Sequence, residues 1–209
     1  MIGLFGGSFD PVHIGHLRIG EDIREYFSLE EIIFIPAYQS PLKPETRASA
    51  EDRLYMLKES IKYNPKFKVS DFELRRKEKS YTIYTAKYFV KKLGYFPAFI
   101  VGTDAFLTLH KWKEAEKIVK LLNFIVVGRN DFNIEILKKY LQTHFPNIEL
   151  LIDKTSIDKN KTAVYFFGKR RIDVSSSEIR QRIKENKTIT YLVLPEVEYY
   201  IIKKKLYRG

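Results

Sequence analysis

The chain begins with the run Met1-Ile-Gly-Leu-Phe-Gly-Gly-Ser-Phe-Asp-Pro-Val-His-Ile-Gly-His16, and this stretch decides the fold. Its apolar start, residues 2–5, has the length of a β-strand. Gly6-Gly7-Ser8 then forms a flexible turn, and His13 and His16 lie where a helix is expected to begin. A strand, a glycine turn and a helix N-terminus leave free backbone N–H groups beside the positive end of the helix dipole. We therefore expect this stretch to bind a nucleotide phosphate.

The composition is that of a globular protein. The 209 residues are 44% hydrophobic and 14% aromatic, which suits one packed domain. No apolar run approaches the roughly 20 residues that a membrane span requires. Because no signal segment precedes the first strand, we expect a soluble, cytoplasmic protein without a membrane partner. The absence of Cys excludes disulfides, thiol nucleophiles and thiolate metal sites.

The net charge of +11 allows two interpretations. One is an anion-binding surface for nucleic acid, membrane phosphates or small polyphosphate substrates. The other is a Lys-rich, solvent-exposed surface, because Lys and Glu are abundant while Gln occurs only at positions 39, 142 and 181. Enrichment in Lys and Glu is typical of heat-adapted proteins. We favour the second interpretation.

Apolar segments alternate with amphipathic ones along the whole chain. Strands are expected at residues 2–5, 30–36, 67–70, 96–101, 124–127, 148–152 and 163–167. Helices are expected at residues 14–26, 49–61, 80–93, 105–122 (one or two, interrupted near His110), 132–145, 176–184 and 196–205. The segments 37–48 and 153–161 are expected to be loops, and residues 71–79 to be charged and irregular.

This alternation predicts an α/β fold. We expect a single Rossmann-like domain over residues 1–209, with a mostly parallel sheet and helices on both faces. In such sheets ligands bind at the carboxyl ends of the strands. The loops after Phe5, Pro36, Val101 and Val127 are therefore expected to form one rim.

The run from Phe5 to His16 resembles the signature of the nucleotidyltransferase superfamily, whose hallmark is His-x-Gly-His. The longer match, Gly-Gly-Ser-Phe-Asp-Pro-Val-His-Ile-Gly-His, resembles in particular the bacterial nicotinate-nucleotide adenylyltransferases. By residue type, the glycines let the backbone approach a phosphate, and the imidazoles can donate hydrogen bonds to its oxygens. The alternative is a pair of histidines that only cap a helix. We assign His13 and His16 to catalysis, and to ATP binding Gly6, Gly7, Ser8, Phe9 and His16.

Residues 174–180, Val-Ser-Ser-Ser-Glu-Ile-Arg, are similar to the second hallmark of that superfamily. Ser175 or Ser176 is a natural N-cap, and further hydroxyl groups can contact phosphate. Arg180 lies one turn into the helix and can clamp ATP phosphates with its fork of donors. Alone, the segment is an ordinary capped helix; with the N-terminal motif it predicts a nucleotide site that includes Ser175, Ser176 and Arg180.

Three further matches concern the nucleotide and its acceptor. Gly102-Thr-Asp104 followed by Trp112 resembles the family's Gly-x-Asp…Trp element, in which Asp104 can accept hydrogen bonds from ribose hydroxyls. The resemblance implies that Trp112 packs against a pyridine ring; core packing is the alternative. Ser80-Tyr81-Thr82 matches a helix start whose backbone amides can hold a nicotinate carboxylate. Arg129 matches the position that meets the acceptor phosphate.

Ser40-Pro-Leu-Lys43 corresponds to a loop that reads Pro-Pro-His-Lys in many relatives. Leu42 replaces the His, which leaves the role of this position open. Lys43 can reach the triphosphate, and we count it with Ser8 among the acceptor-binding residues and with the histidines as catalytic. Arg53 also matches the family and is interpreted as structural.

The resemblance implies transfer of AMP from ATP to nicotinate mononucleotide, which gives nicotinate adenine dinucleotide and pyrophosphate in NAD biosynthesis. The acceptor phosphate is already ionised and can attack the α-phosphorus in line, so positioning and charge stabilisation suffice. The donors are His13, His16, Lys43 and Arg180. Mg²⁺ is expected to arrive on the ATP phosphates, since the sequence offers no carboxylate cage for a metal.

Two alternative functions remain, one from the same superfamily and one from a different class of protein. One is another adenylyl- or cytidylyltransferase of the superfamily, such as phosphopantetheine adenylyltransferase; Tyr81, Trp112 and Arg129 favour a pyridine mononucleotide instead. The other is a basic RNA-binding protein, but no arginine-rich or aromatic RNA motif appears, so no nucleic-acid partner is expected. The sequence leaves open the choice between acid and amide mononucleotide, and the oligomeric state.

Overall fold

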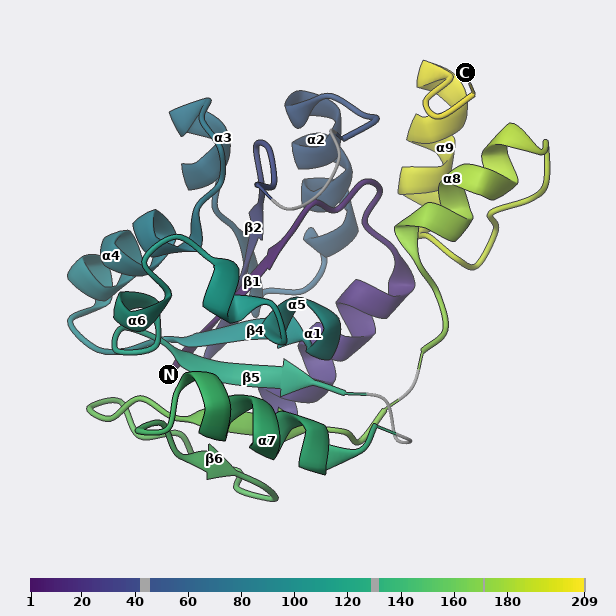
Figure 1. Ribbon diagram of the computed structural model, residues 1–209. Helices are drawn as coiled ribbons and strands as arrows, with labels where there is room; N and C mark the ends of the chain where they lie inside the picture. Colours follow the sequence, from purple (N-terminus) through teal and green to yellow (C-terminus); the bar gives the residue numbers. More distant parts are fainter. Residues whose placement is uncertain (42–45, 129–131, 171, 209) are drawn as a thin grey trace. The chain divides into compact units, whose positions relative to one another are not determined.

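The computed structural model describes residues 1–41, 46–128, 132–170 and 172–208 (Figure 1). The strands are β1 (Ile2–Gly7), β2 (Glu31–Pro36), β3 (Phe67–Val69), β4 (Ala98–Gly102), β5 (Asn123–Val127), β6 (Leu150–Leu151) and β7 (Val164–Phe167). The helices are α1 (Ile14–Tyr26), α2 (Ala50–Ile61), α3 (Phe72–Arg76), α4 (Thr82–Leu93), α5 (Thr103–Phe106), the 3₁₀ helix η1 (Leu109–Lys111), α6 (Ala115–Ile118), α7 (Ile134–His144), α8 (Ser176–Lys184) and α9 (Pro195–Lys204).

The strands form one sheet in the order β3-β2-β1-β4-β5-β7-β6. Neighbours pair in parallel from β1 through β4, β5 and β7 to β6. The register aligns the carboxyl ends of three strands, because Gly102 pairs with Val127 and Val127 with Phe167. The α/β fold with a mostly parallel sheet is confirmed, and the topology is Rossmann-like.

Side chains of β5 and β7 show that helices cover both faces of the sheet. Phe124 lies beside Val164 in the register, so Phe124 and the next residue of β7, Tyr165, point to opposite faces. Phe106 of α5 packs edge-on against Phe124, with ring centroids 5.2 Å apart. Phe27, just after α1, packs against Tyr165 at 5.8 Å. Helix α5 and the end of α1 therefore lie on different faces, as expected.

The chain divides into two compact units. Unit 1 comprises residues 1–6, 23–32 and 81–171, and unit 2 comprises residues 7–22, 33–80 and 172–209. In unit 2, α2 packs against both β3 and α9. Tyr55 of α2 stacks on Tyr200 of α9 at 4.2 Å, and the Tyr200 hydroxyl donates to Asp52 at 2.8 Å. The expectation of a single domain stays a prediction.

Helix ends agree with the sequence where local side chains mark them. Helices α1 and α8 have the expected bounds. Ser49 caps α2 by accepting the N–H of Asp52 at 3.0 Å, and Gly94 ends α4 with a left-handed φ of 75°. In the described part of the chain, no helix is long and apolar enough to cross a membrane.

Two segments differ from the expectation. Residues 71–79 are not wholly irregular, since they contain the five-residue helix α3, which is anchored by buried Leu74 and ends at Lys77 in the left-handed region. The expected helix or helices at residues 105–122 are three short pieces: α5, η1 and α6. Glu114 is left-handed, with a φ of 57°, and this breaks the helical path before α6. Each of these helical pieces is too short to show a helical period in the sequence.

Candidate functional site

His13 and His16 form a stacked pair at the start of α1. Their ring centroids are 3.7 Å apart with an interplanar angle of 28°. The backbone N–H of His13 donates to Nδ1 of His16 at 3.3 Å. In the neutral imidazole of His16 the proton is therefore on Nε2, which makes Nε2 the donor nitrogen. The edge of Phe9 packs against the same ring at 5.0 Å.

His13 is buried, with 7% of its surface exposed, and burial lowers its pKa from 6.5 to about 4. Among the described residues its Nδ1 has no hydrogen-bond partner. Gly15 makes room for the ring, because a Cβ at that position would lie 3.0 Å from Nδ1. His13 is thus a neutral imidazole at pH 7 and can donate through one nitrogen only.

The burial of His13 predicts a loss of stability in mild acid. Above pH 6.5 the ring is neutral in both the folded and the unfolded chain, so it does not change the free energy of unfolding. As the pH falls from 6.5 towards 4, the unfolded chain binds a proton that the folded chain excludes. The folded state should lose up to about 3 kcal/mol over this range.

This loss is measured by urea unfolding at pH 7.5 and pH 4.5. The variant His13→Gln serves as the control because it lacks the titrating ring while the other groups still titrate. We expect the wild type to lose more stability than the variant between the two pH values. Equal losses would show that His13 takes up a proton in the folded protein.

Helix α8 docks on the loop between β1 and α1 within unit 2. Ser175 is its N-cap and accepts the N–H of Glu178 at 3.1 Å, as expected for one of the two serines. The Ser176 hydroxyl donates to the carbonyl of Pro11 at 2.8 Å, and Arg180 Nη1 donates to that of Asp10 at 2.7 Å. The two motifs, about 165 residues apart in sequence, are thus in direct contact.

Asp10 is a buried carboxylate that organises this loop. Its oxygens accept the backbone N–H groups of Arg47 at 2.7 Å and of Ala48 at 3.1 Å, and the Tyr207 hydroxyl at 2.8 Å. Burial, together with the charge of Asp10, raises the pKa of Tyr207 well above its usual range, so Tyr207 remains a donor. Asp10 therefore holds three separate segments of the chain together.

The fully buried side chain of Arg53 stabilises the loop between β1 and α1. Its Nη1 donates to the carbonyl of Ser8 at 2.7 Å and its Nη2 to that of Tyr38 at 3.2 Å. Burial lowers the pKa of Arg53, and the charge of Asp10 opposes this effect. These contacts agree with the structural role expected for Arg53.

A cavity of about 440 Å³ opens beside this loop in unit 2. Among the described residues, its lining includes three cations and three hydroxyl groups but no carboxylate: Thr46, Arg47, Ser177, Arg180, Gln181, Lys184 and Tyr207. Arg180 is held towards it, because its Nη2 donates to Ser177 Oγ at 3.1 Å. Such a cavity suits a polyanion of the size of a few phosphate groups.

The residues expected to bind the acceptor begin at the N-terminus of α4. Ser80, in unit 2, accepts the N–H of Tyr38 at 2.9 Å and donates its own N–H to Gln39 at 2.8 Å. Its amide is therefore occupied. In unit 1, Tyr81 is the N-cap of α4 and Thr82 is its first residue. Helical geometry gives the N–H groups at this end no partner one turn earlier, but the N–H of Tyr84 donates to the Tyr81 carbonyl at 3.0 Å.

The Gly-x-Asp…Trp element lies in unit 1, at the carboxyl end of β4. Gly102 is the N-cap of α5, and Asp104 is exposed in its first turn. Trp112 is half-buried, and its Nε1 donates to Thr108 Oγ1 at 3.1 Å. Because Trp112 is only half-buried, part of its ring surface is accessible to a ligand.

The structure distributes the expected site residues over the two units. Unit 1 holds Gly6, Tyr81, Thr82, Gly102, Asp104 and Trp112. Unit 2 holds Gly7, Ser8, Phe9, His13, His16, Ser80, Ser175, Ser176 and Arg180. Leu42, Lys43 and Arg129 lie outside the described residues.

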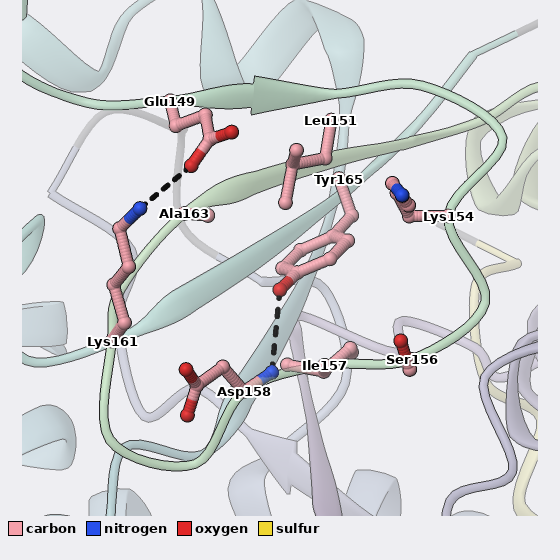
Figure 2. Close-up of a pocket in the computed structure, with 9 residues that line it drawn as sticks. All are labelled: Glu149, Leu151, Lys154, Ser156, Ile157, Asp158, Lys161, Ala163 and Tyr165. Atoms are coloured by element: carbon pink, nitrogen blue, oxygen red, sulfur yellow. Dashed lines mark hydrogen bonds and ion pairs between the residues drawn. The ribbon is translucent and has the colours of Figure 1, made fainter.

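A second cavity, of about 430 Å³, lies in unit 1 between β6, β7 and the loop that joins them (Figure 2). Figure 2 shows Lys161 paired with Glu149 and the Tyr165 hydroxyl in a hydrogen bond with the backbone of Asp158. The ion pair measures 2.8 Å, and the N–H of Asp158 donates to the Tyr165 hydroxyl at 3.4 Å. Ala163, at the amino end of β7, lines it. Ligands of parallel sheets bind at the carboxyl ends of strands, so we do not assign this cavity to the site.

The donor set does not suggest a resident metal. Within the described residues, no group of three His, Asp or Glu side chains is placed to hold a metal ion. The buried Nδ1 of His13 without a partner is a single nitrogen, whereas Mg²⁺ prefers several oxygen ligands.

Several residues of the site escaped the sequence analysis. Lys184 lies one helical turn after Arg180, a spacing that places both on one face of α8 and that the sequence could have revealed. Asp10 belongs to the quoted motif, but its partners Arg47 and Tyr207 are 37 and 197 residues away. No local pattern signals those contacts.

Comparison with known proteins agrees with this geometry. The model of the cytidylyltransferase-like family matches residues 4–182. A protein of Aquifex aeolicus named "probable nicotinate-nucleotide adenylyltransferase" is 45% identical over 84% of this chain and 98% of its own length. A protein of the same name from Hydrogenobaculum sp. is 38% identical over 99% and 97% of the two chains.

Solved structures show the same fold. The nicotinic acid mononucleotide adenylyltransferase of Plasmodium falciparum, complexed with NaAD, superimposes with a TM-score of 0.76 at 24% identity, over 99% of this chain and 96% of that one. A crystal structure from Vibrio parahaemolyticus named "putative nicotinate-nucleotide adenylyltransferase" superimposes with a TM-score of 0.63 at 18% identity, over 100% of this chain and 95% of that one. With two nucleotide motifs in contact and relatives matched along nearly the full chain, the protein belongs to the nicotinate-nucleotide adenylyltransferases of the cytidylyltransferase-like family.

Proposed function

We propose that the protein transfers AMP from ATP to nicotinate mononucleotide, forming nicotinate adenine dinucleotide and pyrophosphate. The observation that carries the proposal is the docking of α8 on the His-x-Gly-His loop. Ser176 and Arg180 donate to the carbonyls of Pro11 and Asp10, which brings two phosphate-binding motifs together in one unit. Relatives that match nearly the whole chain carry the name of this activity.

In this reaction an oxygen of the acceptor phosphate forms a bond to the α-phosphorus of ATP. The bond from that phosphorus to the bridging oxygen of the β-phosphate breaks, and pyrophosphate leaves with the electron pair. No proton has to be removed from the attacking oxygen, because the phosphate is already ionised. Nε2 of His16 donates to the oxygens of the α-phosphate as they gain charge, and the neutral ring of His13 braces His16 by stacking.

The β- and γ-phosphates of ATP, which leave as pyrophosphate, bind in the cationic cavity beside α8. Arg180, Arg47 and Lys184 neutralise the β- and γ-phosphates there, and Ser177 adds a hydroxyl donor. Mg²⁺ would arrive with ATP as part of the substrate and would neutralise part of the charge of its phosphates.

The acceptor is held by the residues at the start of α4 and after β4. Trp112 packs on the pyridine ring, and the backbone amides of the N-cap Tyr81 and of Thr82 hold its carboxylate. Lys43, Arg129 and Ser8 are assigned to the phosphates of the bound nucleotides from the sequence alone. The cytoplasmic location and the absence of a nucleic-acid partner likewise stay predictions from the sequence.

A pyrophosphate-release assay tests the proposal. ATP and Mg²⁺ are offered with nicotinate mononucleotide, its amide analogue or phosphopantetheine in parallel. We expect release with a pyridine mononucleotide and none with phosphopantetheine. Release with phosphopantetheine alone would move the protein to another branch of the superfamily. Salt-dependent RNA binding without any pyrophosphate release would favour the RNA-binding alternative.

Replacing the two cations of the cavity other than Arg180 should weaken ATP binding. For the double variant Arg47→Gln, Lys184→Gln we expect a KM for ATP raised about tenfold, since each lost cation–phosphate contact near the surface is worth roughly 0.5–1 kcal/mol. Inhibition by added pyrophosphate should weaken in parallel. Lys187→Gln is the matched control, because Lys187 pairs with Glu185 at 2.7 Å and does not line the cavity. An unchanged KM in the double variant would place the leaving phosphates elsewhere.

A further inference from the structure

Tyr140 of α7 joins that helix to the segment that carries Trp112, within unit 1. Its hydroxyl group accepts the backbone N–H of His110 in η1 at 3.0 Å and lies 3.0 Å from Nδ1 of the same residue. Trp112 follows His110 by two residues and is the C-cap of η1. One side chain of α7 therefore holds the backbone two residues before the indole ring.

The ring of Tyr140 keeps its hydroxyl group in place. Tyr140 is half-buried, and its ring packs edge-on against Phe106 of α5 at 6.0 Å. Phe106 is fully buried and packs in turn on Phe124 of β5 at 5.2 Å. Burial raises the pKa of Tyr140, so the hydroxyl group stays protonated throughout the neutral range. Tyr140 thus links η1 to the core around β5.

The segment around Trp112 depends on such contacts because its own helices are short. Helices α5 and α6 have four residues each and η1 has three, and helices of this length are not stable on their own in water. Buried Leu109 anchors η1, and Tyr140 supplies an acceptor for the N–H of His110, which a helix start does not provide. The bond from Trp112 Nε1 to Thr108 lies within the segment, so the indole ring moves with η1.

We propose that Tyr140 is a positioning residue for the acceptor, because its hydroxyl group holds η1 where Trp112 can pack on the pyridine ring. The inference rests on the proposed function, which assigns that ring to Trp112. Without the hydroxyl group, η1 spends part of the time away from this position. The apparent affinity for the acceptor then falls with the fraction of molecules that remain competent to bind it. The phosphates of ATP are assigned to residues of unit 2, so the KM for ATP should change far less.

The variant Tyr140→Phe tests this role, because it removes the hydroxyl group and keeps the ring that packs on Phe106. We expect the KM for the pyridine mononucleotide to rise about threefold, within the net contribution of one hydrogen bond, while kcat and the KM for ATP stay near those of the wild type. Trp112 is the only Trp of the chain, so Trp fluorescence reports on its surroundings alone. In the variant without substrate, the emission should shift to longer wavelength and acrylamide should quench it more strongly.

Tyr95→Phe is the matched control in the same unit. The Tyr95 hydroxyl accepts the backbone N–H of Ile2 at 3.1 Å, at the amino ends of β1 and β4. Because each variant lacks one hydroxyl acceptor, both should lose similar stability in urea unfolding. Tyr95→Phe should nevertheless keep the wild-type KM values and the wild-type Trp emission.

Three results would overturn the inference while the proposed function stands. One is an acceptor KM that is unchanged in Tyr140→Phe, or that rises equally in Tyr95→Phe. Another is a KM for ATP that rises as much as the KM for the acceptor. The third is an emission spectrum of Trp112 that does not differ from that of the wild type. If the wild type releases pyrophosphate with neither mononucleotide, the proposed function fails and this inference fails with it.

Discussion

Replacement of His16 by Ala is expected to lower kcat by about 100-fold or more, the usual cost of losing one transition-state donor. Nδ1 of His16 accepts the backbone N–H of His13, so the neutral ring presents its proton on Nε2. A donor fixed in this way needs no reorientation when charge builds on the α-phosphate. Because the interaction strengthens in the transition state, the KM for ATP should change by less than about threefold.

Steady-state kinetics of pyrophosphate release measure this effect. The ring of His16 also stacks on His13 and contacts Phe9, so thermal unfolding of the variant must be compared with that of the wild type. His16→Gln retains an N–H donor at a similar distance and should recover part of the lost rate. A kcat near that of the wild type in His16→Ala would remove this residue from the reaction.

Replacement of Asp10 by Ala should cause the largest loss of stability, about 3–5 kcal/mol. The substitution leaves three donors without their acceptor: the N–H groups of Arg47 and Ala48 and the hydroxyl of Tyr207. It also removes a negative charge that stabilises the buried, positively charged guanidinium group of Arg53. Removing one partner of a buried charged network costs more than the network contributes as a whole.

Urea unfolding at neutral pH measures this loss. Glu149→Ala is the matched control, because Glu149 makes an exposed ion pair with Lys161 at 2.8 Å and its loss should cost less than about 1 kcal/mol. The double variant Asp10→Ala, Tyr207→Phe should be less destabilised than the sum of the two single variants, since both remove the same hydrogen bond. Additive effects, or a loss for Asp10→Ala as small as for the control, would contradict the role given to Asp10.

The sequence predicted the elements whose ends are marked by nearby residues. Helix α8 was placed correctly because Ser175 is a capping residue three positions before Glu178. Helix α3 and the broken segment from α5 to α6 were not, because their geometry depends on contacts such as the bond between Trp112 and Thr108. Short helices fixed by tertiary contacts carry no period that a pattern can reveal.

The same contrast between local patterns and tertiary contacts applies to the candidate site. The resemblance of residues 6–16 and 175–180 to two hallmarks of one superfamily was enough to predict that they belong to one site. In the structure, Ser176 and Arg180 donate to the carbonyls of Pro11 and Asp10. The resemblance was not enough to find the cationic cavity, whose walls come from residues 46–47, from α8 and from Tyr207.

The hydrogen bond between Tyr207 and Asp10 has a consequence for synthesis on the ribosome. It joins residues that are 197 positions apart, so the loop that starts the chain cannot acquire its final partners until the last helix has emerged. A chain released before α9 would lack both Tyr207 and the packing of α9 on α2. Synthesis of the chain through Tyr207 is therefore a condition for a fully formed phosphate loop, and chains that stop before α9 should be inactive.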